Sequence, residues 1–381
     1  MSESTRQSTN AATFDPDLVN QARPGHGIPS QDVNPAAQVA LSPEEAEREG
    51  SSVMTGGGMV GGAAVGAGIG VLVGGPVGVV VGGSLGAIAG ALGGAAMGEM
   101  GALGTSALPP AMPDHGVRLH IEDSGGSGRP VVLIHGWPLS AQAWKPQTSV
   151  LQEAGFRVVA YDRRGFGHSD KPESGYSYDT LADDLQRVME HCGLQQVTLV
   201  GFSMGGGEVA RYIARHGQAR VHSVVFAAAV TPFLMNSADN PDGPLTPAKA
   251  QENAAAFEQD RVAYFDQFTT TFYSAGGVLQ VTEPQRRETL ALCEQSAQHA
   301  ALACMASFAN TDFREDLKVL TVPTLVIHGA SDAIVPFEGS GQRTHSAVVH
   351  SQLVKIDGAP HGLNVSYATA FNEALLKFLQ E

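Results

Sequence analysis

The chain has 381 residues, of which 43% are hydrophobic and 16% charged, and its formal net charge is −15. This length is enough for one large domain or two ordinary ones, and an acidic chain without a basic run is not expected to bind nucleic acid. The three cysteines, Cys192, Cys293 and Cys304, are scattered without a CxxC spacing, which argues against a disulfide framework and against a zinc site.

Residues 1–50 hold eight acidic side chains against three arginines and are rich in Ser, Asn, Gln, Ala and Pro. Such a composition is typical of disorder, so we predict a disordered acidic N-terminal segment. A capping box formed by Ser42 and Glu45 indicates one short helix start within it. No basic stretch followed by an apolar run opens the chain, so we expect no secretory signal peptide and a cytoplasmic or membrane-associated protein.

Residues 51–107 form a Gly/Ala/Val-rich segment with a single charged residue, Glu99. Glycine stands at every fourth position from Gly58 to Gly98, which on a helix places the glycines along one ridge. Such a ridge lets two backbones pack closely, as in membrane GxxxG pairs, and Pro76 divides the run into halves of roughly membrane-spanning length. The segment resembles the glycine-zipper hairpins of bacterial membrane-associated proteins.

That resemblance implies membrane association or self-association into an oligomer through residues 54–107. Two alternatives stay open, because glycine costs about 1 kcal/mol relative to alanine in a helix in water. The segment then is either a flexible Gly/Ala linker or a soluble packing element.

Residues 112–381 alternate β-rich apolar runs with helical stretches. Strands are expected at 131–135, 157–161, 197–201, 221–227, 324–328 and 351–356, and helices near 141–154, 177–192, 205–216 and 367–380. This alternation predicts an α/β fold of the α/β-hydrolase type, with a doubly wound, mostly parallel sheet. Residues 231–311 have helical composition and no clear strand, which predicts a helical cap inserted after the strand at 221–227.

A G-x-S-x-G motif lies at 201–205, between an apolar run and a helical stretch. In this strand–turn–helix context the motif predicts a nucleophile elbow with Ser203 as the nucleophile. Side chains at Gly201 and Gly205 would collide with the neighbouring strand and helix, which explains both glycines. The alternative is that Ser203 only caps the helix.

A nucleophilic serine needs a base and an acid that orients the base, and in this fold the chain order is Ser, acid, His. Asp332 follows a predicted strand at its carboxyl end, where active-site groups gather, and is the expected acid. His361 lies on a Gly/Pro loop after the next strand and is the expected base. Of the competitors, His328 is expected to pack in the core, and Asp357 lies too close along the same loop.

The turn after the strand at 131–135 is the expected oxyanion loop. We expect the backbone N–H groups of Trp137 and Met204 to form the oxyanion hole, and we interpret His135 as structural. The charged run 162–170 resembles a catalytic segment, but we interpret it as a loop whose charges satisfy buried backbone groups.

Four motifs with matching order and spacing carry a family resemblance. They are His-Gly-Trp-Pro-Leu-Ser at 135–140, Tyr-Asp-Arg-Arg-Gly-Phe-Gly-His-Ser at 161–169, Gly-Phe-Ser-Met-Gly-Gly-Gly-Glu at 201–208 and Gly-Ala-Pro-His-Gly-Leu at 358–363. Residues 113–381 resemble the bacterial cofactor-free haloperoxidases, which are also described as perhydrolases and arylesterases. Residues 1–110 are not covered by the resemblance.

The resemblance implies that small esters or carboxylic acids form an acyl-enzyme on Ser203, which water or hydrogen peroxide then attacks. A peracid made in this way oxidises bromide or chloride, so no cofactor and no metal site are expected. Pro138 would shape the acyl pocket, and Phe233, Phe308 and Ile334 are further candidates for its lining.

Two alternatives remain: a plain esterase or lactonase with incidental peroxidase activity, or a membrane-associated or self-assembling scaffold that carries a hydrolase. Haloalkane dehalogenases and epoxide hydrolases are disfavoured, because they use aspartate where this chain has Ser203.

Overall fold

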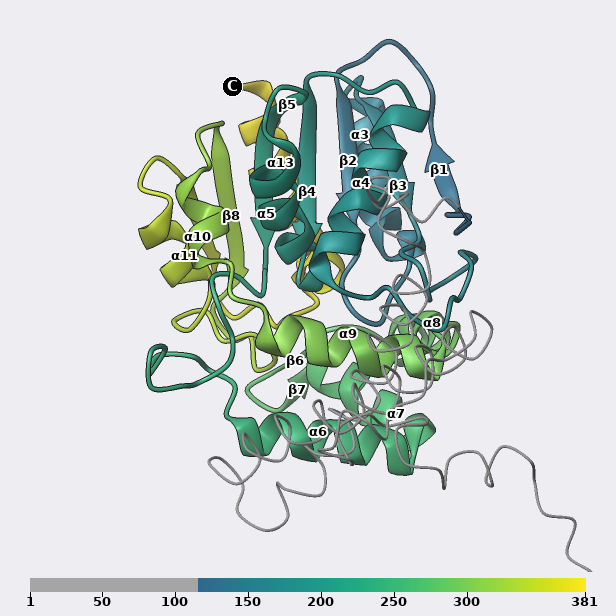
Figure 1. Ribbon diagram of the computed structural model, residues 1–381, viewed down its shortest axis with the longest axis vertical. Helices are drawn as coiled ribbons and strands as arrows, with labels where there is room; N and C mark the ends of the chain where they lie inside the picture. The colour runs from purple at the N-terminus through teal and green to yellow at the C-terminus, as the bar shows by residue number, and fades with distance from the viewer. Residues whose placement is uncertain (1–115) are drawn as a thin grey trace, which may run out of the picture. The chain divides into compact units, whose positions relative to one another are not determined.

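The computed structural model describes residues 116–381, so the predicted N-terminal segment, the glycine zipper and their boundaries lie outside the described residues. Its centre is a seven-stranded sheet with the order β1-β3-β2-β4-β5-β8-β9 (Figure 1). The strands are β1 (Ile121–Asp123), β2 (Pro130–Ile134), β3 (Arg157–Tyr161), β4 (Val197–Phe202), β5 (Val221–Ala227), β8 (Thr324–Gly329) and β9 (Gln352–Ile356). All neighbours pair in parallel except β1, which runs antiparallel to β3. The predicted mostly parallel sheet is confirmed.

The central strands β2 and β4 are almost entirely buried. Strands that are covered on both faces need apolar side chains at successive positions, which is why they read as continuous apolar runs in the sequence. Their register decides where the loops meet. Ile134 pairs with Gly201, and Gly201 pairs with Phe226, so the loops that follow β2, β4 and β5 leave the sheet side by side.

Two pairs of helices cover the sheet (Figure 1). The pair α4 (Tyr178–His191) and α5 (Met204–His216) packs on one face, and the pair α3 (Lys145–Glu153) and α13 (Ala368–Gln380) packs on the other. Short helices complete this part: η3 (Ala141–Trp144), α10 (Arg314–Lys318), α11 (Gly341–Ala347) and α12 (Leu363–Ser366). None of the helices in residues 116–381 is long and apolar enough to cross a membrane.

The predicted helical cap is confirmed and lies over the carboxyl ends of the strands (Figure 1). It consists of α6 (Pro247–Gln259), α7 (Arg261–Phe272), α8 (Glu283–Glu294), α9 (Gln298–Asn310) and a small hairpin of β6 (Ser274–Ala275) and β7 (Val278–Leu279). Local sequence defines its helix starts: Asp260 caps α7 through the Ala263 N–H, and Thr282 and Gln285 form a capping box on α8.

Candidate active site

Ser203 lies on the sharp turn between β4 and α5 with a backbone φ of +54°, a conformation that few non-glycine residues adopt. Its N–H donates to the Ala227 carbonyl at 2.8 Å, and its side chain makes no cap hydrogen bond to α5. The turn requires the flanking glycines. A Cβ at Gly201 would lie 2.5 Å from the Gly205 carbonyl oxygen, and a Cβ at Gly205 would lie 2.5 Å from that of Ile134.

The structure brings the three side chains of the predicted triad into one hydrogen-bonded row. His361 Nε2 lies 3.0 Å from Ser203 Oγ, and His361 Nδ1 lies 2.6 Å from Asp332 Oδ2. All three residues are buried and follow the carboxyl ends of β4, β8 and β9. With Nδ1 donating to the carboxylate, Nε2 is the nitrogen that is left to accept the hydroxyl proton.

The Asp332 carboxylate is held from both sides. Its Oδ1 accepts hydrogen bonds from the backbone N–H groups of Ile334 and Val335, at 2.9 and 2.8 Å. Burial alone would raise the pKa of Asp332, but the charge of His361 and the hydrogen bonds from His328 and His361 outweigh it. They hold the pKa of Asp332 well below its usual range, so the acid is ionised at neutral pH.

His328 does more than pack in the core, which was not expected from the sequence. It is completely buried, its Nε2 donates to the Val335 carbonyl at 2.8 Å, and the same nitrogen lies 3.3 Å from Asp332 Oδ2. A Cβ at Gly341 would lie 2.5 Å from its Nδ1, so α11 closes over the ring. His328 therefore fixes the loop that carries the acid.

The expected oxyanion loop passes directly against the serine. A Cβ at Gly136 would lie 2.8 Å from the Phe202 ring and 3.0 Å from Ser203 Cβ. Within residues 116–381, no protein acceptor takes up the backbone N–H of Trp137 or of Met204, the first residue of α5. Both donors are thus available beside the serine, and their role in an oxyanion hole stays a prediction.

The Trp137 side chain packs into the cap. Its Nε1 donates to the Ala301 carbonyl of α9 at 3.0 Å. Five aromatic rings surround the indole with centroids 5.2 to 6.2 Å away: Phe257, Tyr264, Phe265, Phe268 and Phe308. The loop that carries an expected oxyanion donor is therefore anchored in α6, α7 and α9.

The expected pocket residues occupy different positions. Pro138 is buried directly after Trp137. Phe233 lies against Arg314, whose guanidinium carbon is 5.4 Å from the centroid of the Phe233 ring. Phe308 and Ile334 are half-buried, and a lining role for these residues stays a prediction.

Two aromatic rings beside the base were not singled out from the sequence. They are Phe202, which ends β4, and Phe272, which ends α7, with ring centroids 5.2 and 5.3 Å from that of His361.

The charged run 162–170 contacts buried backbone groups, which fits its interpretation as a structural loop, and it also forms buried ion pairs. Asp162 accepts from the N–H groups of Ala141 and His168, each at 2.8 Å. Two ion pairs were not expected from the sequence: Arg163 pairs with the buried carboxylate of Glu208, and Arg164 pairs with that of Asp184.

His135 packs beside this run, and its structural interpretation fits its surroundings. Its Nε2 accepts from the Arg163 N–H at 2.9 Å. Burial and the charge of Arg163 hold the pKa of His135 well below its usual value, so the ring stays neutral and accepts this bond.

Known proteins match the region that carries these residues. Residues 129–366 match a family model described as the alpha/beta hydrolase fold. The non-heme chloroperoxidase of Kitasatospora aureofaciens is 38% identical over 270 residues, which cover 70% of this chain and 97% of that protein. A bifunctional esterase/perhydrolase of Acinetobacter calcoaceticus is 36% identical over 267 residues, which cover 70% and 97%. The crystal structure of a bromoperoxidase from Bacillus anthracis has a TM-score of 0.68 and 49% identity, and the match covers 70% of this chain and 96% of that one.

Proposed function

Because the chain belongs to the α/β-hydrolase fold family, and within it to the non-heme haloperoxidases, we propose that it is a serine hydrolase that forms an acyl-enzyme on Ser203. The observation that carries this proposal is the continuous row from Ser203 Oγ through His361 to Asp332, with separations of 3.0 and 2.6 Å. A serine becomes a nucleophile when a base takes its proton and an acid keeps that base in the correct tautomer and orientation.

The proposed reaction begins with a small carboxylic ester. His361 Nε2 takes the hydroxyl proton as Ser203 Oγ attacks the carbonyl carbon, and ionised Asp332 stabilises the imidazolium. The N–H groups of Trp137 and Met204 donate to the oxyanion of the tetrahedral intermediate. His361 then passes its proton to the departing alcohol, which leaves an acyl group on Ser203. One such donor contributes about a hundredfold to a thousandfold to kcat in comparable sites.

The acyl-enzyme has two outcomes, depending on which nucleophile attacks it. Water regenerates Ser203 and releases a carboxylic acid, whereas hydrogen peroxide regenerates Ser203 and releases a peracid. The peracid then transfers one oxygen atom to bromide, which gives hypobromous acid and the carboxylate. This scheme accounts for haloperoxidase-type activity with peroxide as the oxidant, and it agrees with the two activities named for the Acinetobacter relative, esterase and perhydrolase.

The test compares wild-type protein with Ser203→Ala in two assays, hydrolysis of 4-nitrophenyl acetate and bromination of monochlorodimedone with acetate, peroxide and bromide. We expect Ser203→Ala to lower both rates by at least about ten-thousand-fold. The control is Ser346→Ala on the exposed side of α11, which should retain both rates. Unchanged ester turnover in Ser203→Ala would contradict the mechanism.

The same assays separate the perhydrolase from a plain esterase or lactonase. We expect peroxide to compete with water for one acyl-enzyme. With 4-nitrophenyl acetate as substrate, a higher peroxide concentration should give more peracetate and less acetate. The rate of nitrophenol release should stay the same, because acylation limits it. Nitrophenol release without peracetate, at any peroxide concentration, would support the plain esterase instead.

A further inference from the structure

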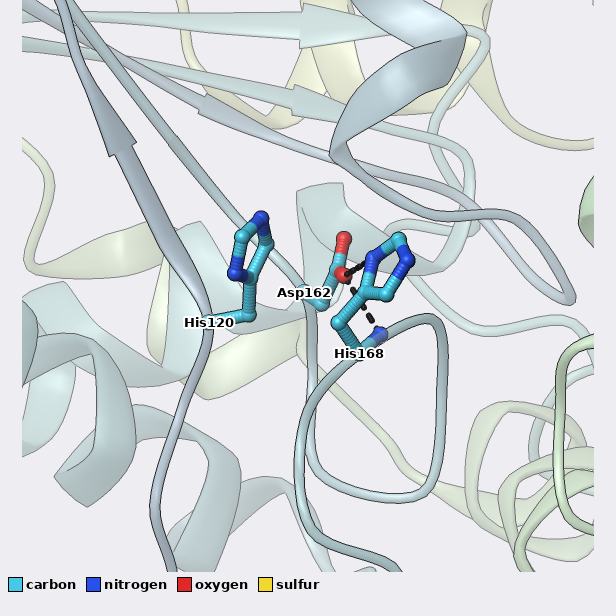
Figure 2. Close-up of side chains that lie close together, drawn as sticks. All are labelled: His120, Asp162 and His168. Atoms are coloured by element: carbon cyan, nitrogen blue, oxygen red, sulfur yellow. Dashed lines mark hydrogen bonds and ion pairs between the residues drawn. The ribbon is translucent and has the colours of Figure 1, made fainter.

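Two histidines and a carboxylate lie together outside the proposed active site, at the start of β1 and in the loop after β3. Figure 2 shows His120 and His168 on either side of Asp162. One ligand atom from each of the three residues lies within 4.8 Å of the other two. The imidazole centroids are 5.0 Å apart, and His168 Nδ1 lies 3.4 Å from Asp162 Oδ2.

The backbone holds the two segments in this arrangement. The Asp162 N–H donates to the His120 carbonyl at 2.9 Å, and the His120 N–H donates to Ser169 Oγ at 2.8 Å. The turn before His168 is tight, since Gly167 has a φ of +48° and a Cβ there would lie 2.2 Å from the Asp162 carboxylate. The ligand set is therefore assembled by the fold and does not depend on a flexible loop.

Asp162 differs from the other buried acids of this region in its partners. Arginines neutralise Glu208 and Asp184, whereas no lysine or arginine in residues 116–381 forms an ion pair with Asp162. Its one ion-pair partner there is His168, and the residue is 1% exposed. A buried carboxylate is stabilised by a nearby positive charge, and a cation held by the two imidazoles would supply to Asp162 the charge that arginine supplies to Glu208 and Asp184.

We propose that His120, Asp162 and His168 bind a divalent transition-metal ion, with zinc as the expected occupant. Zinc takes imidazole nitrogen and carboxylate oxygen at about 2.0–2.2 Å, whereas calcium and magnesium prefer oxygen ligands alone. Tetrahedral ligands at that length lie about 3.3 Å from one another. The 3.4 Å between His168 Nδ1 and Asp162 Oδ2 already fits this value.

The histidine side chains have room to complete the site. The His168 side chain is 63% exposed and that of His120 is 39% exposed, so small rotations bring both rings onto one ion. Glu122 Oε1 lies 3.5 Å from His120 Nε2, so a further carboxylate stands beside the cluster. The three protein ligands leave a fourth position for water on the exposed side.

An ion at this position ties the start of β1 to the loop after β3. In the sheet order β2 stands between β3 and β4, the strand that leads to Ser203, and we expect the ion to act on stability. Sequence spacing did not reveal it, because strand pairing alone brings His120 to the 162–168 segment.

The experiment titrates zinc chloride into chelator-treated full-length protein by isothermal calorimetry. Wild type is compared with His120→Gln, His168→Gln and a control, His216→Gln, which removes a histidine 2.8 Å from an aspartate elsewhere on the surface. We expect the cluster variants to bind at least about tenfold more weakly than wild type, and His216→Gln to bind like wild type.

Thermal unfolding gives an independent reading. Zinc should raise the midpoint of wild type and of His216→Gln, but not that of His168→Gln, whose zinc-free midpoint should equal that of wild type because its side chain is exposed. Equal zinc affinity in wild type and both cluster variants, or no binding by wild type at millimolar zinc, overturns the proposal.

Discussion

Replacing Asp332 with asparagine changes one atom of the proposed triad and reverses the direction of a hydrogen bond. The amide of the Asp332→Asn variant would keep an oxygen for the N–H groups of Ile334 and Val335, which lie 2.9 and 2.8 Å from Oδ1. Its NH₂ group would then face His361 Nδ1, where Asp332 Oδ2 now lies at 2.6 Å. The ring must accept this bond at Nδ1 and carry its proton on Nε2, so it faces Ser203 Oγ as a donor and can no longer take the hydroxyl proton.

The expected loss follows from that tautomer change. An asparagine in the orienting position of a Ser-His-Asp triad lowers kcat by about ten-thousand-fold, which corresponds to about 5.5 kcal/mol of transition-state stabilisation. We expect KM for 4-nitrophenyl acetate to change little, because Asp332 is buried behind His361 and does not face the substrate.

The matched control is Asp357→Asn. Asp357 is exposed and lies four residues before His361 on the same loop, so it competes with Asp332 as an orienting acid on sequence grounds. We expect this variant to keep the wild-type kcat within about twofold. Steady-state kinetics of ester hydrolysis at pH 7 measure both. A wild-type kcat in Asp332→Asn, or an equal loss in Asp357→Asn, would refute the assignment.

Two further predictions concern stability. Gly205→Ala should lower the free energy of unfolding, measured in urea, by about 1–3 kcal/mol, because the added Cβ would lie 2.5 Å from the Ile134 carbonyl oxygen. An unchanged midpoint of urea unfolding would contradict this and would show that the turn can relax. Burial raises the pKa of Asp332, but His361 and His328 outweigh burial, so the pKa of this residue is lower in the folded protein than in the unfolded chain. The ionised carboxylate therefore stabilises the fold at pH values above the unfolded pKa of about 3.9, and this stabilisation is lost progressively as the pH falls below that value. The difference in unfolding free energy between wild type and Asp332→Asn should therefore shrink between pH 5 and pH 3, and a constant difference would contradict this.

The large elements of the fold were predictable because their patterns are long. The buried runs of β2, β3, β4, β5 and β8 and the helical periods of α4, α5 and α13 stand in the sequence within a residue or two of their observed bounds. β1 was not predicted, since three residues, Ile121–Asp123, are too few to show a period, and tertiary pairing with β3 alone defines them.

The proposed triad was predictable for a different reason. One local motif marks Ser203, and the order of strands then restricts the acid and the base to the loops after β8 and β9. His328 lies only four residues before Asp332, and its contact with the carboxylate was missed because the ring was expected to pack in the core. The other features that were missed depend on contacts between distant segments: Phe272 beside His361, and the cluster around Asp162. No spacing rule connects these positions, because packing of the cap and pairing of β1 bring them together.

The indole of Trp137, held among the rings of α6, α7 and α9, couples two properties that engineering usually treats as separate. In the proposed mechanism the cap helices shape the acyl pocket, while the backbone of Trp137 lies beside the nucleophile. A substitution that moves α7 to admit a bulkier substrate also pulls on that backbone, and a displacement of about 1 Å can cost about a hundredfold in rate. The proposed mechanism therefore couples selectivity to turnover, and we expect a redesign of the cap to keep activity only if it preserves the aromatic contacts of the indole.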